Sequence, residues 1–249
     1  MTDDAALLAI AFFAVAVLYS TVGHAGASGY LALMALLGVA PATMRPTALA
    51  LNVLVAAVAT YRFRRAGWTG WNDLLPFVLA SVPFAYLGGL THLPVAGYRA
   101  MLGCVLIFSA AVMLWRASGG GESIQERPLA IPRYVALGSG AAIGLLSGLT
   151  GTGGGIFLSP LLLLAGWAGP RGAAGLAAPF ILLNSIAGLL GLQWSQGSLP
   201  AELPLYAAAV VAGGLLGTTL GLQFLRGRWL LVVLALVLCV AGGKLLLTR

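Results

Sequence analysis

The sequence is short of charge. Only 8% of its 249 residues are charged, 60% are hydrophobic, and the mean hydropathy is +1.01. A water-soluble domain carries roughly 25% charged residues, so this composition excludes an ordinary soluble fold. The few charges separate apolar stretches of roughly 15 to 22 residues, close to the ~20 that a helix needs to cross a bilayer. The composition therefore predicts an all-α polytopic membrane protein with the lipid bilayer as its main partner.

Residues that carry enzymatic and metal chemistry are also scarce. The chain has two cysteines and two histidines. Cys104 and Cys239 lie inside apolar stretches with no Cys-x-x-Cys spacing, which argues against a disulfide framework or a zinc site. The HExxH motif and the paired aspartates of intramembrane hydrolases are absent, and a His24–Ser28 dyad in a glycine-rich turn has little fixed geometry. We therefore expect no catalytic residue, no enzymatic activity, no cofactor and no metal.

The chain divides into ten apolar segments. One long polar stretch, ASGGGESIQERPLAIPR at 117–133, separates five segments from five. We accordingly predict a first transmembrane repeat at 1–116, a polar cytoplasmic linker at 117–133 and a second transmembrane repeat at 134–249. The predicted segments are 5–21, 28–40, 46–61, 73–91, 98–116, 134–149, 155–168, 173–192, 203–223 and 229–247.

The two halves match each other at a constant offset of 128 residues. An odd number of segments in each half means that the second copy enters the membrane upside down, as in the secondary transporters that are built from inverted repeats. The offset therefore predicts two inverted-repeat halves. The coincident pairs are Gly23 and Gly151, Gly26 and Gly154, Gly38 and Gly166, Pro76 and Pro204, and Gly89 and Gly217.

The basic residues indicate an orientation. With the N-terminus outside, nine of the thirteen basic residues fall on cytoplasmic loops and four fall outside, in agreement with the positive-inside rule. This asymmetry accounts for the net charge of +7 without a nucleic-acid partner. The first residues, MTDD, lack the basic region of a cleavable signal peptide, so we expect none. The nine are Arg62, Arg64, Arg65, Arg116, Arg127, Arg133, Arg171, Arg226 and Arg228, and the four are Arg45, Arg99, Lys244 and Arg249.

Segments 28–40 and 155–168 are too short to span a bilayer comfortably. Each follows a glycine-rich turn, STVGHAGASGY at 20–30 and GLTGTGGGIF at 148–157. We expect a broken or re-entrant helical hairpin in each half, reaching the midplane from opposite sides, because irregular backbone at that depth must be buried or line a cavity. Free N–H groups at a helix N-terminus bind anions, so the two turns predict an anion site. The alternative is that the glycines only let helices pack closely.

Three stretches resemble the TauE/SafE sulfite exporter family. They are TGTGGGIFLSPLLLLAGWAGP at 150–170, its partner GHAGASGYLALMALLGVAP at 23–41, and the basic loop YRFRRAGWTGWNDLLP at 61–76. The resemblance covers essentially the whole chain. It implies a multi-pass protein of the bacterial inner membrane that exports small sulfur-containing anions such as sulfite or organosulfonates. With the charge asymmetry above, both termini would then be periplasmic.

Some side chains near the turns suit an anion. His24 titrates near neutral pH and can donate to an oxyanion or carry a proton, or it is a structural histidine bonded to a carbonyl. Asn52 and Asn184 lie in mid-segment and either line the pathway or tie helices together. The substrate-binding candidates are Thr21, Gly23, His24, Gly26, Ser28, Gly29, Arg45, Asn52, Thr150, Gly151, Thr152, Gly153, Gly154, Arg171 and Asn184.

Arg45 and Arg171 precede segments 46–61 and 173–192 at roughly repeat-related positions. We expect both near an interface, because burial of an arginine costs ~2.5–3.5 kcal/mol on insertion scales. There they attract anions into opposite vestibules, or they are ordinary helix-end residues whose side chains reach the interface.

No carboxylate lies at the centre of any segment. This absence disfavours a cation site and a carboxylate proton relay, and it favours an anion as cargo. Proton coupling would then run through His24 or the substrate itself, or the membrane potential would drive transport with ~2.3 kcal/mol per charge per 100 mV. The sequence thus predicts a secondary transporter of a small sulfur-containing anion, with an anion channel of the same inverted architecture as the alternative. It does not indicate the oligomeric state.

Overall fold

The computed structural model describes residues 3–21, 23–119, 131–193, 199–223 and 228–247. Ten α-helices and no strand are found in these ranges, so the prediction of an all-α polytopic membrane protein is confirmed. The helices are α1 (Asp3–Thr21), α2 (Ala27–Leu36), α3 (Pro41–Arg65), α4 (Trp71–Leu90), α5 (Val95–Ala117), α6 (Arg133–Thr150), α7 (Gly155–Leu164), α8 (Pro170–Gln193), α9 (Leu203–Gln223) and α10 (Arg228–Leu247).

Eight helices begin before the predicted residue, and two of them, α3 and α8, begin at a proline. α3 begins at Pro41 instead of residue 46, and α8 at Pro170 instead of residue 173. A proline in the first turn of a helix is favourable, because that turn leaves N–H groups unpaired and the ring already fixes a helical φ. Arg45 therefore lies inside α3 and Arg171 inside α8, rather than ahead of these helices as predicted.

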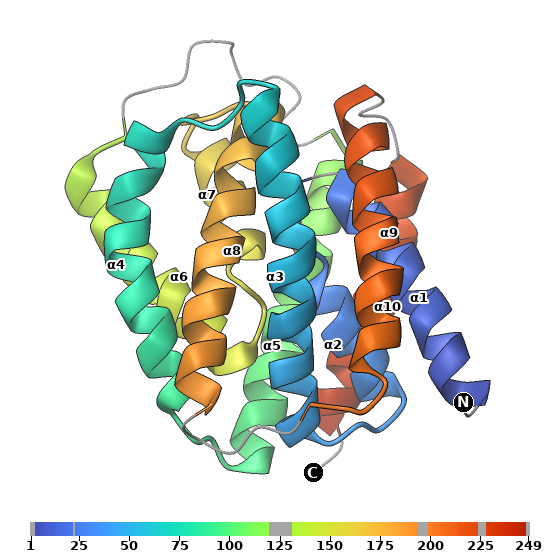
Figure 1. Cartoon of the computed structure of the whole chain (residues 1–249). Helices are drawn as coiled ribbons and strands as arrows, with labels where there is room; N and C mark the ends of the chain where they lie inside the picture. The colour runs from blue at the N-terminus through green and yellow to red at the C-terminus, as the bar shows by residue number, and fades with distance from the viewer. Residues whose placement is uncertain (1–2, 22, 120–130, 194–198, 224–227, 248–249) are drawn as a thin grey trace.

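The helical hairpins enter the molecule from opposite faces (Figure 1). α1 rises from the face that carries both termini and α2 returns toward it, whereas α6 and α7 do the same from the opposite face. Five helices, α3, α4, α5, α8 and α9, are long and apolar enough to cross a membrane. α2 and α7 have only ten residues each, about 15 Å of helix, so each reaches only part of the way through a bilayer core of ~30 Å.

Helix α6 packs on α4 through a stripe of glycines. Gly140, Gly144 and Gly148 are spaced one turn apart, and a Cβ atom on any of them would lie within 2.4 Å of a carbonyl oxygen of α4. Only glycine permits such close backbone approach, as in other membrane helix pairs. The facing carbonyls belong to Phe77, Ser81 and Ala85.

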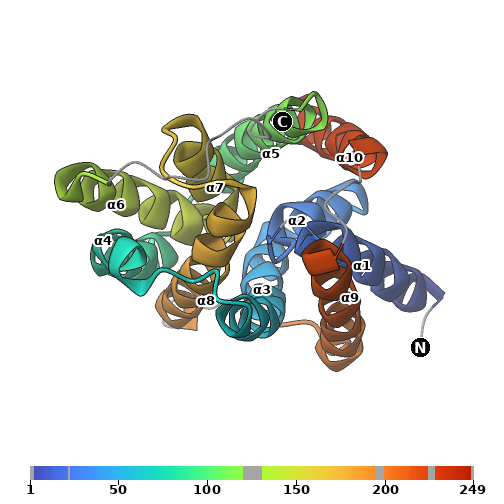
Figure 2. The same ribbon diagram turned by 90° about the horizontal axis from the view of Figure 1, so that it is seen from above.

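Helix α9 packs on α1 in the same way. A Cβ on Gly213, Gly217 or Gly221 would lie between 2.2 and 2.6 Å from carbonyl oxygens of α1. The first helix of each half thus packs on the fourth helix of the other half (Figure 2). In addition, α3 packs on α8 and α5 packs on α10. Glycines in the bodies of α6 and α9 therefore serve helix packing, and of these only Gly148 belongs to a predicted glycine-rich turn.

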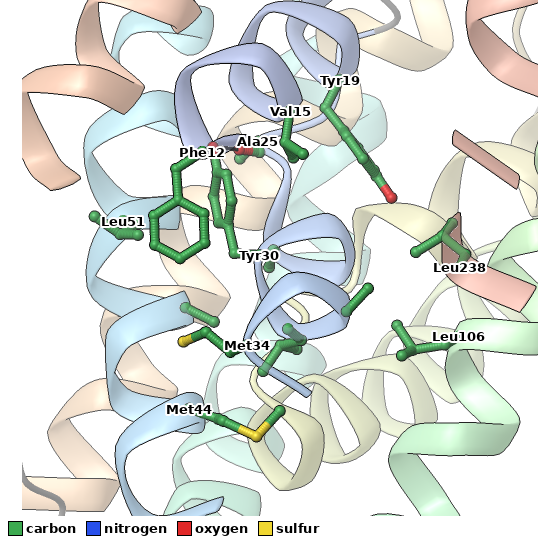
Figure 3. Packing of buried hydrophobic residues seen from close by; sticks show 14 of the residues in the cluster. Phe12, Val15, Tyr19, Ala25, Tyr30, Met34, Met44, Leu51, Leu106 and Leu238 are labelled. Carbon is green, nitrogen blue, oxygen red and sulfur yellow. Dashed lines mark hydrogen bonds between the residues drawn. The ribbon is translucent and has the colours of Figure 1, made fainter. Parts of the chain in front are cut away.

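Each short helix has its own apolar surroundings. α2 lies in the larger cluster of buried side chains, where the rings of Phe12 and Tyr30 meet edge to face with centroids 5.1 Å apart. Figure 3 shows Tyr30 and Met34 of α2 with Phe12 and Leu51 on one side and Leu106 and Leu238 on the other. α7 contributes Leu158, Leu162 and Leu163 to a second cluster with α4, α6 and α8. Apolar contacts therefore hold the ends of both short helices in place.

Candidate functional site

The two glycine turns have left-handed backbone at the starts of the short helices. Gly26 (φ 101°) is the N-cap of α2 and Gly154 (φ 82°) is the N-cap of α7. A glycine has no side chain to bond the first-turn N–H groups, which in most helices are satisfied by a capping Ser, Thr, Asn or Asp. Both helices therefore begin without an N-cap side chain at the middle of the molecule.

Asn52 of α3 joins the two turns. Its Oδ1 accepts the N–H of Ala27, the first residue of α2, at 3.1 Å. Its Nδ2 donates to the carbonyl of Thr152 at 3.3 Å and to the hydroxyl of Ser185 at 3.4 Å. The side chain is 1% exposed. Of the two roles predicted for Asn52, the structure shows the one that ties helices together.

His24 makes a second link between the turns. The side chain is 2% exposed, and its Nε2 lies 3.1 Å from the carbonyl oxygen of Gly155, at the start of α7. Because a carbonyl oxygen only accepts, Nε2 carries the hydrogen in this contact. The imidazole also meets Tyr19 edge to face with ring centroids 6.5 Å apart. The predicted carbonyl-bonded histidine is thus observed, and the carbonyl belongs to the other half of the chain.

The hydroxyl candidates bond within the protein. Thr21 donates to the carbonyl of Leu18 at 2.6 Å, and Ser28 pairs with the Tyr19 hydroxyl at 2.7 Å. Thr150 donates to the carbonyl of Leu146 at 2.7 Å, so in the 2.9 Å contact between the two threonines Thr152 donates to Thr150. In this conformation these hydroxyls stabilise the turns rather than lie free.

Asn184 of α8 is different. It is fully buried, and neither its Nδ2 nor its Oδ1 has a hydrogen-bond partner among the described residues. A buried amide group without a partner costs ~1–3 kcal/mol. Gly188, one turn further on, faces Leu49 of α3 and Gly148 of α6, so Asn184 lies on the side of α8 that faces these helices.

Ser147 of α6 lies near the same place, and sequence analysis missed it. Its hydroxyl is buried without a partner among the described residues. A Cβ on Gly154 would contact both Ser147, at 3.4 Å, and Phe180, at 2.9 Å, and Phe180 precedes Asn184 by one turn of α8. A serine inside an apolar segment is the only signal in the sequence, and buried residues such as Ser81 and Ser109 share it without lying at a turn.

Arg45 is buried in the protein near the start of α3. Its side chain is 7% exposed, and its Cγ would lie 3.1 Å from a Cβ atom added to Gly151. The guanidinium donates to carbonyls at the C-terminal ends of two helices, which carry partial negative charge. The acceptors are Gly148 of α6 (2.8 Å from Nε and 2.5 Å from one terminal nitrogen), Gly88, Gly89 (3.2 Å) and Thr91 (3.1 Å). None of these partners is a carboxylate.

Arg171 is not the counterpart of Arg45. It is exposed in the first turn of α8, and its guanidinium lies 5.7 Å from the ring centroid of Trp68. The two arginines therefore differ in burial and partners, and Arg45 is the fifth residue of its helix whereas Arg171 is the second.

The glycine candidates divide into two kinds. Gly23, Gly26, Gly151, Gly153 and Gly154 have positive φ and shape the turns. Gly29 lies inside α2, where a Cβ would lie 2.5 Å from Val15 and 2.9 Å from Tyr19, so it serves the packing of α2 on α1. Among the described residues, no group of three or more His, Cys, Asp or Glu side chains comes together that could hold a metal.

The structure thus brings together, where the two turns meet, residues of α2, α3, α6, α7 and α8. His24 and Asn52 join the turns directly, Thr150 and Thr152 bond each other within the second turn, and Arg45 packs on Gly151. Asn184 and Ser147 add buried polar groups without partners. Tyr98 of α5, which sequence analysis also missed, donates its hydroxyl to the carbonyl of Thr150 at 3.2 Å. Thr21 and Gly29 lie on the α1 side of the first turn, and Arg171 lies apart.

Comparison with known proteins identifies the chain's relatives. Residues 7–245 match the family model "Sulfite exporter TauE/SafE". The chain is 43% identical, over 99% of its length and all of the relative's, to the "Probable membrane transporter protein y4hK" of Sinorhizobium fredii. It is 32% identical over 116 residues to a "Probable membrane transporter protein" of Xylella fastidiosa, of which it covers 44%. No solved structure matches. The chain therefore belongs to the sulfite exporter TauE/SafE family of membrane transporters.

Proposed function

We propose that this protein is a secondary transporter, not an enzyme, that exports a small sulfur-containing anion, sulfite or an organosulfonate, across the bacterial inner membrane. The anion binds where the two glycine turns meet, beside Asn184. The family model supports the class of cargo. The position and chemistry of the site rest on the residues described above.

The observation that carries this proposal is the buried, unpartnered amide of Asn184 near the second turn. Its Nδ2 can donate to an oxyanion, and so can the hydroxyl of Ser147. Uncapped N–H groups at the start of α7 lie one residue past Gly154, which is itself next to Ser147. An anion there would satisfy donors that are otherwise buried without an acceptor, and this gain offsets the cost of leaving water.

The charge at this place favours an anion. Arg45 is a buried cation whose partners are all neutral carbonyls, and it packs against Gly151 of the second turn. The starts of α2 and α7 contribute partial positive charge, worth ~0.3–1 kcal/mol for each helix and up to ~2 when partly buried. These terms are moderate, so the anion would bind weakly enough to leave again, as transport requires.

Inverted-repeat halves would give the carrier its two access states. Exchanging the halves converts the α1–α9 contact into the α6–α4 contact and leaves the α3–α8 and α5–α10 contacts unchanged. The two hairpins reach the turns from opposite faces (Figure 1). This pairing supports repeats at 1–116 and 134–249, joined by the linker at 117–133, of which 120–130 lie outside the described residues. Rocking of one half against the other would then open the site to each side in turn.

His24 is proposed to couple transport to protons. Its link to Gly155 joins the two halves where they would separate, and a second proton on the ring changes that contact. The positive-inside count supports a periplasmic location for both termini, and α1 begins and α10 ends on one face of the molecule.

Anion flux into proteoliposomes tests the proposal. Sulfite, methanesulfonate, sulfate, phosphate and chloride would be compared with and without a proton gradient. We expect saturable movement of sulfite or methanesulfonate that phosphate and chloride do not outcompete. Flux that fails to saturate, at rates far above those of carriers, would instead indicate the channel. If folded protein moves none of the five anions, the site proposal is wrong.

The coupling role is tested with His24→Gln, which keeps an N–H donor for the Gly155 carbonyl but does not titrate. The matched control is His92→Gln, at the other histidine, which is exposed between α4 and α5. We expect His24→Gln to transport without gradient dependence while the control behaves as the wild type. Equal gradient dependence in both variants would exclude His24 as the coupling residue.

A further inference from the structure

A pocket opens on the face where α1 begins and α10 ends. Its volume is about 140 Å³. A water molecule requires roughly 10–15 Å³, so the pocket has room for a small oxyanion with several waters. The end of α2, the first turns of α3 and α5 and the last turn of α10 form it. Its lining includes Gly38, Val39, Met44, Tyr98, Arg99 and Lys244.

Two cations line this pocket. Arg99 is half-buried, and no hydrogen bond or ion pair joins it to any described residue. Lys244 is exposed and donates to the carbonyl of Leu36, at the end of α2, at 2.8 Å. Lys244 thus offsets the negative end of α2, while the first turns of α3 and α5 present their positive ends to the pocket. A half-buried guanidinium without a partner is a ready donor for an oxyanion.

The pocket adjoins the second glycine turn. Tyr98 lines it and is itself 4% exposed, because its hydroxyl reaches inward to the carbonyl of Thr150. Met44, on the same wall, precedes Arg45, whose side chain packs on Gly151. Tyr98 and Met44 therefore lie between the pocket and the site proposed above.

We propose that this pocket is a vestibule that binds small oxyanions, with Arg99 as its main donor and Lys244 as a second charge, and that Tyr98 closes its inner end. The anion would be a sulfonate or sulfite on its way to or from the central site. This inference rests on the proposed function for the identity of its anion, but the vestibule's charge can be measured without transport.

The offset of the repeat supports a matching arrangement at the other face. Lys244 lies 128 residues after Arg116, and Gly38 lies 128 residues before Gly166. Arg116 is half-buried near the end of α5, and Gly166 follows α7 as Gly38 follows α2. A carrier that opens to each side in turn needs an entrance on both faces, and the repeat supplies a basic residue at each.

Thiol modification measures the charge of the vestibule directly. Val39→Cys would be introduced with Cys104→Ser and Cys239→Ala, and its reaction with an anionic sulfonate reagent (2-sulfonatoethyl methanethiosulfonate) compared with that of a cationic trimethylammonium analogue. We expect the sulfonate reagent to react faster, and Arg99→Gln to lower the anion-to-cation rate ratio by about fivefold, as removal of one nearby charge predicts. Arg99→Lys should keep the preference. Arg171→Gln, on α8 at the opposite face, is the matched control and should leave the ratio unchanged.

The same Arg99→Gln variant is then assayed for sulfite flux from the side that bears the termini. A raised KM for sulfite with an unchanged maximal rate supports the vestibule as a site that binds the anion during transport. An unchanged ratio of modification rates in Arg99→Gln would overturn the vestibule. If the wild-type protein reacts faster with the anionic reagent but transports no anion, the vestibule is supported and the proposed function is refuted. The two failures are therefore distinct.

Discussion

The two asparagines in the middle of α3 and α8 have opposite surroundings. Asn52 uses both ends of its amide, accepting from Ala27 and donating to Thr152 and Ser185. Asn184 is equally buried and uses neither end within the described residues. The same residue type is thus a structural joint in one helix and an unsatisfied group in the other.

This difference separates stability from function in the centre of the molecule. A buried amide whose hydrogen bonds are complete without a ligand contributes to folding, and replacing it leaves its partners unpaired. A buried group without a partner lowers stability, so its presence calls for another explanation, and a ligand is one. The comparison is therefore a test: substitutions at the two asparagines should have effects of opposite kinds.

Replacement of Asn52 should have the largest effect on stability. Asn52→Leu leaves the Ala27 N–H, the Thr152 carbonyl and the Ser185 hydroxyl without their partner, at a cost of about 2–4 kcal/mol. Reversible unfolding in detergent, followed by circular dichroism, measures this free energy. Asn184→Leu, the matched variant, should unfold at the same denaturant concentration as the wild type or a higher one. Equal destabilisation by both variants would erase the distinction between the asparagines.

Glycine packing should be the next most sensitive feature. A Cβ on Gly144 would lie 2.2 Å from the carbonyl oxygen of Ser81, and backbone cannot move aside as a side chain does. Gly144→Ala should therefore cost about 1–3 kcal/mol of unfolding free energy. Gly138→Ala, on the same helix with nothing within 4 Å of the new Cβ, is the control and should be neutral or slightly stabilising. If both variants unfold alike, α6 does not pack on α4 as closely as described.

The sequence predicts the helices better than the site. Hydropathy and the cost of unpaired backbone in lipid leave few alternatives, so the ten segments and both broken hairpins are predictable from the sequence. α3 and α8 begin earlier than the predicted segments, at Pro41 and Pro170, because a proline is favourable in the first turn of a helix. Arg45 consequently lies inside α3 rather than before it.

Partners across the chain could not be predicted. His24 and Gly155 are 131 residues apart, and Asn52 and Thr152 are 100 apart, so no local pattern reveals which turn each side chain meets. The same holds for Arg99 and Lys244, which face one pocket from α5 and α10. Sequence alone gave residue types suited to an anion, and only the packing of the helices decided which of them are already bonded.

Transport should respond to Asn184 where stability does not. Asn184→Leu removes the unpartnered amide, and we expect kcat/KM for sulfite or methanesulfonate to fall by about tenfold, equivalent to ~1.4 kcal/mol of lost anion binding. Asn184→Gln keeps the donor and should retain part of the flux. The measurement is initial rate against concentration in proteoliposomes. Full activity in Asn184→Leu would remove the amide from the site.

Replacement of Arg171 should have the smallest effect. This residue is exposed, and its guanidinium lies over the Trp68 ring, a contact worth ~0.5–1 kcal/mol at an exposed site. Arg171→Gln should change the unfolding free energy by no more than about 1 kcal/mol and leave kcat/KM unaltered. Arg45→Gln should impair both, because five hydrogen bonds to four carbonyls depend on its guanidinium. If Arg171→Gln loses as much flux as Arg45→Gln, the two arginines are an equivalent pair, one at each entrance. Anion recognition would then depend on the two faces of the molecule rather than on the buried turns.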